Sequence, residues 1–231
     1  MNWYDLLSTR YNQECYIYGK GPSLTYWLKE GVGLDGGETD SYRICINEAA
    51  NLVPKPDYIV SLNECTWSNV QRQPGLKAVV QKDLLQTVKK LGWKDDELIV
   101  FSREARAEWV LRWSREEIAQ TQYLYASIGS LITAVHFAWF LGSQTVNFVG
   151  IGGHGYAAPF GAAPVPDNVY EKIWAITLRV CDTLGVEPVL WADPTVDGLG
   201  PYQPTEAQRE NTEAQGTISG TMAASSPITI Q

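Results

Sequence analysis

The sequence predicts an α/β fold in which a mostly parallel β-sheet is covered by helices on both faces. Short apolar runs rich in aromatic and β-branched residues alternate along the chain with segments of helical pattern. These runs are apolar at nearly every position, which is typical of strands that are buried on both faces. Several of them end at a glycine or at a polar side chain, as expected where a strand passes into a loop.

Length and composition agree with a globular protein. The chain has 231 residues, which is enough for one large domain, or a domain and a tail, with a sizeable core. Hydrophobic residues make up 45% and charged residues 19% of the sequence. The net charge of −8 argues against a broad basic surface for nucleic acid. The nine Trp and twelve Tyr residues are of the kind that line sugar and base pockets as well as cores.

We expect three parts: a short N-terminal arm at residues 1–14, a single α/β domain at residues 15–192, and a C-terminal tail at residues 193–231. The tail is first acidic and then rich in Ser, Thr, Gly and Ala, a composition that does not favour a packed core. We find no signal peptide and expect no membrane span, because the most apolar stretch, residues 128–141, is too short and contains His136. The four cysteines form no Cys-x-x-Cys pair and no cluster with His. We therefore expect no zinc site, three buried thiols in or beside apolar runs, and a cytoplasmic setting.

The first predicted strand, residues 15–18, leads into a glycine-containing loop, Gly19-Lys20-Gly21-Pro22-Ser23. A strand, a glycine turn and a helix in this order allow backbone N–H groups to approach an anion, because glycine has no Cβ. The alternative is a tight strand-to-helix connection that binds nothing, since the full Gly-x-Gly-x-x-Gly pattern is absent.

The remaining elements follow from the same patterns. Further strands are predicted at residues 43–47, 58–62, 77–81, 98–102, 145–149 and 186–191. Helices are predicted at residues 23–30, 83–92, 104–117, 131–141 and 168–184. The helix at 104–117 rests on the four-residue spacing of Trp109 and Trp113, which suggests an amphipathic face. Gly92 and Gly185 are placed to end their helices.

The predicted strand exits carry glycine and polar residues. These are Gly19 to Ser23, Asn47, Asn63 with Glu64, and Gly150 to His154. Ligands of parallel sheets bind beyond the carboxyl ends of the strands, at the point where the strand order reverses. We therefore expect these residues to lie along one edge of the sheet and to form the binding site.

Five motifs in a particular order carry a resemblance to a known group. They are Gly19-Lys-Gly21-Pro22-Ser23-Leu24, Arg43-Ile-Cys-Ile-Asn47, Pro56-Asp57-Tyr58, Ser127-Ile-Gly129-Ser130 and Phe148-Val-Gly150-Ile151. This order resembles Rossmann-like transferases that use nucleotides. The group includes the 6-hydroxymethylpterin diphosphokinase MptE-like proteins and bacterial sialyltransferases that use a CMP-sugar donor. The resemblance covers residues 15–191.

The resemblance implies roles for residues at matching positions. The loop would hold the donor phosphates or ribose, Asn47 would bind the nucleotide, and Asn63 or Glu64 would stand at the next strand exit. The donor-binding residues expected in this way are Gly19, Lys20, Gly21, Pro22, Ser23, Asn47, Asn63, Glu64, Gly129, Ser130, Gly150, Gly152 and Tyr156. Gly129 and Ser130 would open a helix whose N-terminus faces the base or the phosphate. Tyr156 begins a loop rich in Ala, Pro and Gly that is either a lid over the acceptor or a passive linker.

The chain departs from the group at Gly152, where many relatives carry an acidic residue. Without that carboxylate, a metal-dependent phosphoryl transfer lacks an obvious Mg²⁺ ligand, which favours a transferase that needs no metal. Asp57, Glu64 and Asp167 remain alternative ligands. We therefore expect no metal site and no firmly implied cofactor for a glycosyltransferase, and Mg²⁺ for a diphosphokinase.

The two histidines receive different interpretations. His136 lies in an apolar helix and is interpreted as a core residue. His154 lies among glycines beyond a strand exit and is the candidate catalytic base, since imidazole can deprotonate an acceptor hydroxyl near neutral pH. The alternative is a solvent-exposed histidine in a mobile loop. The sialyltransferases place their histidine nearer to the position of Asp167, where this chain has none.

The sequence thus predicts a transferase with a nucleotide-linked donor and favours a nucleotide-sugar-dependent glycosyltransferase that acts on an acceptor hydroxyl. The alternatives are an MptE-like diphosphokinase that uses ATP and Mg²⁺, and a nucleotide-binding module without catalysis. The acceptor is open between a glycan, a small molecule and a modified nucleic acid. A nucleic acid would require a basic groove, for which the candidates are Lys20, Arg43, Arg103, Arg106 and Arg112. The alternative is that these basic residues belong to an ordinary solvent-exposed surface.

Overall fold

The computed structural model describes residues 2–34, 41–127, 129–151, 160 and 167–191, all of which belong to one compact unit, Met1–Leu199. The predicted tail at residues 193–231 lies outside the described residues, so its role stays a prediction.

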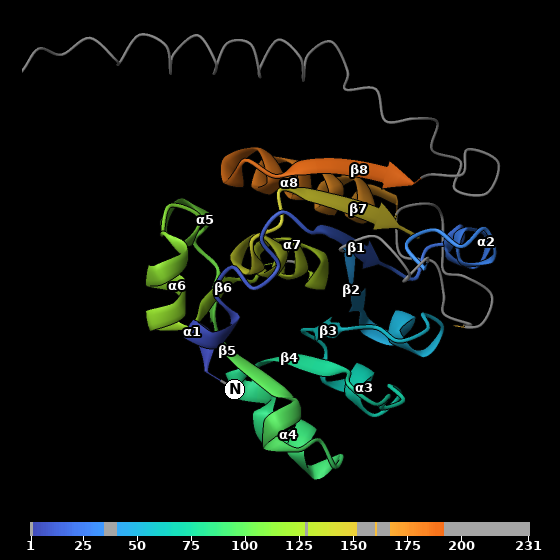
Figure 1. The fold of residues 1–231 in the computed structure, drawn as a ribbon, viewed down its shortest axis with the longest axis horizontal. Helices are drawn as coiled ribbons and strands as arrows, with labels where there is room; N and C mark the ends of the chain where they lie inside the picture. Colours follow the sequence, from blue (N-terminus) through green and yellow to red (C-terminus); the bar gives the residue numbers. More distant parts are fainter. Residues whose placement is uncertain (1, 35–40, 128, 152–159, 161–166, 192–231) are drawn as a thin grey trace, which may run out of the picture. The chain divides into compact units, whose positions relative to one another are not determined.

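Eight parallel strands form one twisted sheet in the order β6-β5-β4-β3-β2-β1-β7-β8 (Figure 1). The strands are β1 Glu14–Tyr18, β2 Ser41–Ile46, β3 Tyr58–Ser61, β4 Lys77–Gln81, β5 Leu98–Glu104, β6 Tyr123–Tyr125, β7 Thr145–Val149 and β8 Glu187–Trp191. The predicted α/β fold with a parallel sheet is confirmed. The three-residue strand β6 was not predicted.

Helices cover both faces of this sheet. The α-helices are α1 Trp3–Leu6, α2 Leu24–Lys29, α3 Glu64–Trp67, α4 Leu85–Lys90, α5 Ala107–Val110, α6 Arg115–Thr121, α7 Ser130–Leu141 and α8 Asp167–Leu184. Short 3₁₀ helices in the described residues include η1 Asn47–Asn51, η2 Lys82–Leu84 and η3 Asp95–Glu97. One face packs against α1 and α5 to α8, and the opposite face packs against α2, η1, α3 and α4.

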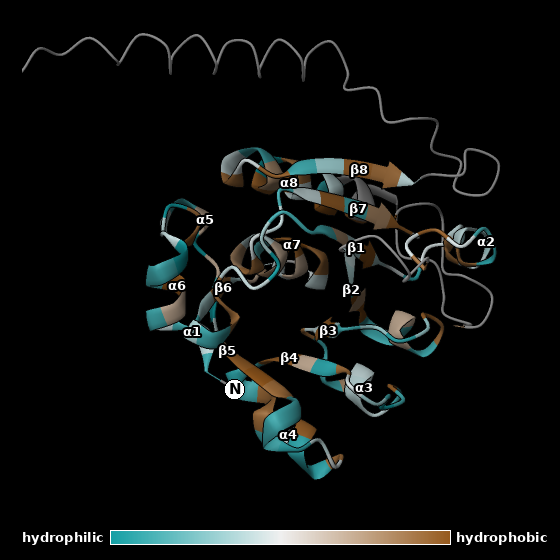
Figure 2. Ribbon diagram, in the orientation of Figure 1, coloured by the Kyte–Doolittle hydropathy of each residue, from teal (hydrophilic) through white to brown (hydrophobic). Residues whose placement is uncertain are grey.

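The alternation of side chains along each strand divides the core in two. On β2, Ile44 and Ile46 belong to the cluster under α7, whereas Cys45 belongs to the cluster on the opposite face. Both sets are buried, which explains why the strands are apolar at almost every position rather than at every second one. In Figure 2 much of β5 is brown, whereas α6 carries teal, polar residues.

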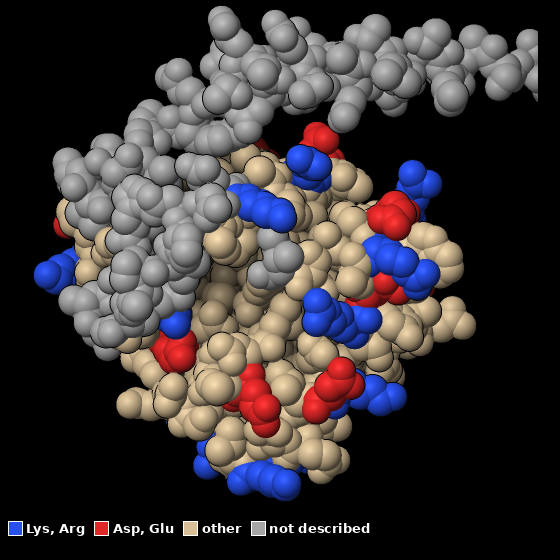
Figure 3. Space-filling model, turned by 180° about the vertical axis from the view of Figure 1, so that it is seen from behind, with Lys and Arg blue, Asp and Glu red and all other residues tan. Residues whose placement is uncertain are grey.

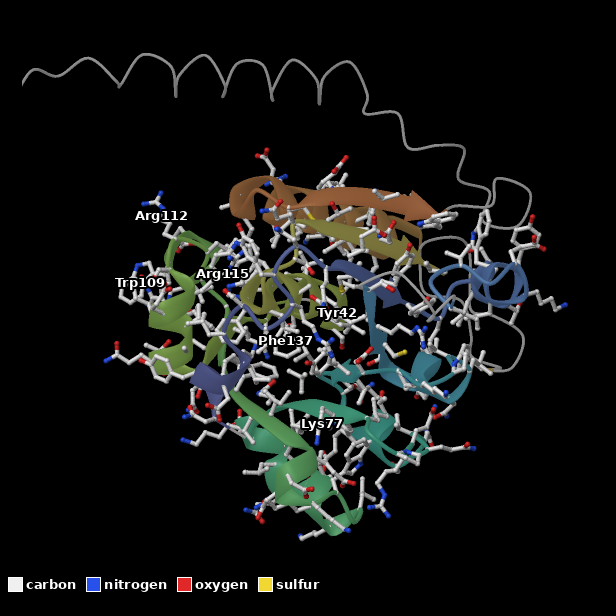
Figure 4. All side chains as sticks on the ribbon, in the orientation of Figure 1. Tyr42, Lys77, Trp109, Arg112, Arg115 and Phe137 are labelled. Atoms are coloured by element: carbon white, nitrogen blue, oxygen red, sulfur yellow. The ribbon has the colours of Figure 1, made fainter. Side chains whose placement is uncertain are left out.

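The central helix is α7, whose side chains are nearly all buried. Its Phe137 packs edge-on against Tyr58 with ring centroids 5.2 Å apart, and Tyr58 packs in the same way against Tyr42 at 6.1 Å (Figure 4). After the C-terminus of α7, the Ser143 hydroxyl donates a hydrogen bond of 2.8 Å to the Gln13 carbonyl, just before β1 begins. The helix therefore runs against the strands, and its N-terminus lies at their carboxyl ends.

The predicted single helix over residues 104–117 is wrong. β5 continues to Glu104, and two short helices, α5 and α6, follow it. Ser114 breaks the helical run because it caps α6: its hydroxyl accepts the Glu117 N–H at 3.2 Å, and the Glu117 carboxylate accepts the Ser114 N–H at 2.7 Å. This reciprocal pair is a capping box, a strong start signal for a new helix. Trp109 consequently lies on the surface, whereas Trp113 packs against Tyr123.

The N-terminal arm is part of the core. The Trp3 side chain is buried, and its indole N–H donates a hydrogen bond of 2.9 Å to the Val100 carbonyl. β6 pairs only with Ser102 to Glu104, so Trp3 covers the part of the β5 edge that β6 does not reach. Farther along the arm, the Arg10 N–H donates to the Leu141 carbonyl at 2.8 Å.

His136 is a core residue, as predicted. It is fully buried in α7, and its Nδ1 accepts the Tyr125 N–H at 2.8 Å, so it covers the outer edge of β6. Burial lowers the pKa of His136 to about 3, so the ring is neutral near pH 7.

The expectation of three buried thiols in or beside strand-like runs is met at Cys15 and Cys45 but not at Cys65, which follows β3 and is exposed. Cys181, in α8, is buried as well. Among the helices that the structure describes, none combines the length and the hydropathy needed to cross a bilayer.

Candidate functional site

The strand order reverses at β1, which lies between β2 and β7. From β1 the chain builds the sheet outward to β6, then crosses back through α7 and adds β7 on the other side of β1. Ligands of parallel sheets bind at such a switch point, beyond the carboxyl ends of the strands. The candidate site is therefore formed by the segments that follow β1, β2, β3 and β7, together with the N-terminus of α7.

The glycine loop after β1 is fastened to the end of β7. The Gly19 N–H donates to the Val149 carbonyl at 2.8 Å, and the Gly21 N–H donates to the Gly150 carbonyl at 2.7 Å. A Cβ on Gly19 would clash with Ile151 and lie 2.6 Å from the Gly150 carbonyl oxygen. Gly19 therefore serves close packing of the loops, and the N–H groups of both glycines already donate within the chain. Contacts to an anion at this loop must come from other groups.

Lys20 and Glu48 form an ion pair across the exits of β1 and β2. The Lys20 Nζ lies 2.7 Å from Glu48 Oε2, and the two side chains are only 14% and 17% exposed. The Lys20 Nζ also lies 5.7 Å from the centroid of the Phe160 ring, which comes from the segment between β7 and α8. Glu48 was not predicted as a site residue. The sequence did contain a signal for Glu48, because it is an acidic residue that directly follows the second predicted strand.

Asn47 and Ser130 join the exits of β2 and β3 to α7. The Ser130 hydroxyl donates to Asn47 Oδ1 at 3.3 Å and accepts the Leu62 N–H at 3.1 Å. Asn47 has a φ of +56°, a left-handed conformation that asparagine tolerates better than most residues. Gly129 is the N-cap of α7, and its backbone is extended. The structure thus brings together two residues that the sequence placed in the site, next to the positive end of a helix dipole.

Asn63 and Glu64 lie at the exit of β3 but have other contacts. Asn63 caps the short helix α3, because its Oδ1 accepts the Cys65 N–H at 3.0 Å. The Glu64 carboxylate accepts a hydrogen bond of 3.0 Å from the Thr87 hydroxyl on α4. Both residues are exposed. Their predicted role in donor binding remains a prediction.

Asp57, an alternative metal ligand in the sequence analysis, lies at the opposite edge of the sheet. It immediately precedes β3, and its carboxylate binds the Arg10 guanidinium at 3.1 Å and the Arg43 N–H at 2.9 Å. It therefore does not share a site with Glu64, which follows β3. Within the described ranges, no three His, Cys, Asp or Glu residues are grouped as a metal ion would require. Gly152, His154 and Tyr156 lie outside the described residues.

Most of the residues considered for a basic groove form hydrogen bonds or ion pairs within the chain, and the groove stays a prediction. Lys20 pairs with Glu48. Arg43 donates to the Gly33 and Leu34 carbonyls, Arg103 to the Ala126 and Ser127 carbonyls, and Arg106 to the Glu104 carboxylate. Arg112 points outward from the segment between α5 and α6 (Figure 4). The face seen in Figure 3 has acidic and basic side chains interspersed.

The parallel sheet, and the polar residues at the carboxyl ends of its strands, define an α/β protein of the Rossmann-like type. No family model and no curated protein matches the chain. Among solved structures, the MAf glycosyltransferase from Magnetospirillum magneticum AMB-1 is similar, with a TM-score of 0.55 and 12% sequence identity. The match covers 92% of this chain and 38% of that protein, so this chain spans well under half of its length. At this identity the similarity concerns the fold.

Proposed function

We propose that this protein is a nucleotide-sugar-dependent glycosyltransferase that acts on an acceptor hydroxyl. The observation that carries the proposal is the grouping of Lys20, Glu48, Asn47 and Ser130 at the switch point of a parallel sheet, at the N-terminus of α7. The similarity of the fold to that of a glycosyltransferase supports the same class of activity.

In this proposal the donor lies across the exits of β1 and β2. Asn47 binds the nucleotide, and the Lys20 ammonium and the N-terminal N–H groups of α7 face the phosphate. The acceptor hydroxyl loses its proton to a base while its oxygen bonds to the anomeric carbon. The bond between that carbon and the phosphate oxygen breaks, and the nucleotide leaves with the electron pair. The proposed base is His154, and positioning supplies much of the rate.

Calorimetric binding tests the donor class. The panel consists of ATP, CMP, UMP and GMP with their nucleotide-sugars, each with and without Mg²⁺. We expect one nucleotide-sugar to bind without metal. Binding of ATP alone, and only with Mg²⁺, would indicate a diphosphokinase instead, and no binding at all would refute the proposal.

A matched pair of variants locates the site. Asn47→Ala removes a side chain from a residue at φ +56°, and Asn12→Ala does the same at φ +60° in the N-terminal arm. The backbone penalty of the two substitutions is therefore similar, and only Asn47→Ala should weaken donor binding. Equal effects of the two variants would show that binding does not depend on the Asn47 side chain.

The catalytic base needs a separate measurement, because it affects turnover rather than binding. His154→Gln should retain binding of the nucleotide-sugar but lose most of its slow hydrolysis, followed as release of free nucleotide. A loss of roughly 10²-fold or more is expected for removal of a general base. Unchanged hydrolysis by His154→Gln would exclude His154 from this role.

A further inference from the structure

We propose that Ser130 is a positioning residue that holds the side-chain amide of Asn47 in one orientation, so that Nδ2 of Asn47 donates a hydrogen bond to the nucleotide-sugar. The site then selects a hydrogen-bond acceptor at this position, namely a phosphate oxygen or an acceptor atom of the base. This inference rests on the proposed function of the same site.

The Ser130 hydroxyl has one hydrogen to donate, and its surroundings determine where that hydrogen goes. Ser130 is only 8% exposed, so water is largely excluded from the hydroxyl. Its oxygen accepts the Leu62 N–H at 3.1 Å, and an N–H group cannot accept the hydroxyl hydrogen in return. Among the residues that the structure describes, the acceptor within reach is Asn47 Oδ1, at 3.3 Å. Since an unpaired buried hydroxyl is costly, Ser130 donates to Asn47.

This hydrogen bond fixes the orientation of the Asn47 amide. An amide carries an acceptor oxygen on one arm and an NH₂ donor on the other. With Oδ1 held by Ser130, Nδ2 lies on the arm that points away from Ser130, and it makes no hydrogen bond within the described ranges. The reverse orientation would leave the hydroxyl hydrogen of Ser130 without an acceptor. Asn47 is half-buried where β2 ends, so Nδ2 is a hydrogen-bond donor at the candidate site.

The same contacts form a chain of hydrogen bonds that runs in one direction. Leu62, which directly follows β3, donates to Ser130 at the start of α7, and Ser130 donates to Asn47 behind β2. Bonds arranged in this way polarise one another. A hydrogen bond accepted by Oδ1 therefore makes the Nδ2 hydrogens better donors, and a bond from Nδ2 to the ligand continues the chain in the same direction.

Substitutions that change the polarity at Asn47 test the direction of this bond. Asn47→Ala removes the donor, whereas Asn47→Asp keeps the shape and the bond from Ser130 but presents an acceptor oxygen to the ligand. Calorimetry on the full chain compares CMP, UMP, AMP and GMP with the four nucleosides. For the nucleotide that the wild type binds, Asn47→Ala should lose about three- to tenfold in affinity, and Asn47→Asp about tenfold more.

The arms of this comparison identify the acceptor atom. If the base supplies it, the nucleoside should show the same order of affinities, and if a phosphate oxygen supplies it, only the monophosphate should. Asn12→Asp is the matched control, because Asn12 also has a positive φ, of +60°, and the substitution adds the same charge in the N-terminal arm. It should bind like the wild type. Binding to Asn47→Asp as tight as to Asn47→Ala would show that the ligand does not accept a hydrogen bond here.

A double-mutant cycle tests whether Ser130 acts through Asn47. Ser130→Ala should weaken nucleotide binding about threefold in the wild type, because the amide is then free to turn. It should cost no further affinity in Asn47→Ala, where there is no amide to orient. A purely structural role of Ser130 would give the same loss in both backgrounds, and that result would refute the inference.

Nuclear magnetic resonance tests the orientation in the wild type and so does not depend on the folding of a variant. The Nδ2 hydrogens of Asn47 point away from Ser130, so the nuclear Overhauser effect between them and the Ser130 β-hydrogens should be weak. Their signals should shift when the bound nucleotide is added. A strong effect between these groups would show the reverse orientation and would refute the inference.

The outcomes separate this inference from the proposed function. If the wild type binds a nucleotide, but Asn47→Asp binds it no worse than Asn47→Ala does, the role of Asn47 as a hydrogen-bond donor is refuted while the binding site stands. If the wild type binds no member of the panel, the proposed function fails, and recognition by Asn47 fails with it.

Discussion

Acidification should destabilise this protein through His136. The imidazole is fully buried, its Nδ1 accepts the Tyr125 N–H at 2.8 Å, and its Nε2 makes no hydrogen bond within the described part of the chain. Protonation would place a charge in the core and would turn the Nδ1 acceptor into a donor that faces the Tyr125 N–H. Burial accordingly lowers the pKa of His136 to about 3.

The sign and the size follow from linkage. In the unfolded chain a histidine takes up its proton at about pH 6.5, whereas folded His136 resists protonation down to about pH 3. The contribution of His136 to stability is therefore fully present above pH 6.5 and is lost as the pH falls. The maximum slope is about 1.4 kcal/mol per pH unit, so the loss between pH 6.5 and 4.5 is about 2 to 3 kcal/mol.

Urea unfolding at a series of pH values measures this loss. His136→Asn keeps an acceptor close to the position of Nδ1 but does not titrate, so its free energy of unfolding should fall less than that of the wild type, by about 2 to 3 kcal/mol over this range. His136→Leu leaves the Tyr125 N–H unpaired and should be about 1 to 3 kcal/mol less stable than the wild type above pH 6.5. This difference should shrink as the pH falls, because leucine does not titrate either. Other titrating groups are common to all three proteins. Parallel pH profiles for the wild type and His136→Asn would refute the reasoning.

Three further results are expected. Gly19→Ala should lower the free energy of unfolding by about 1 to 3 kcal/mol, because its Cβ meets Ile151 and the Gly150 carbonyl, and it should cost more than Gly129→Ala, whose Cβ makes only an ordinary contact with Ile173 at 3.8 Å; equal costs would contradict the packing argument. Ser114→Ala should cost about 1 kcal/mol in urea unfolding by removing the cap of α6, and an unchanged midpoint would show that the capping box is dispensable. In the native protein a thiol reagent should modify Cys65 alone, since the other three thiols are buried, and all four should react in urea; rapid modification of a second thiol would contradict the described core.

Local patterns in the sequence determined most of the elements. Apolar runs located seven of the eight strands, because both faces of a parallel sheet are buried and leave an unbroken signal. β6 was missed because three residues are too few to form a pattern. The prediction of one helix at 104–117 was wrong because it gave the spacing of Trp109 and Trp113 more weight than the capping box of Ser114 and Glu117, which begins a new helix.

The contacts within the site, in contrast, were decided by the tertiary structure. Lys20 and Glu48 are 28 residues apart, and Asn47 and Ser130 are 83 residues apart. Their proximity depends on the order of strands across the sheet and on the direction of α7, which local patterns do not encode. Gly19 and Gly21 show the same difference between sequence and structure. The sequence predicted that the backbone of this loop is closely approached by another group. Only the packing of β1 against β7 determined that the two N–H groups donate to the Val149 and Gly150 carbonyls. Strand patterns depend on which side chains are buried, whereas a site depends on which loops the fold brings together.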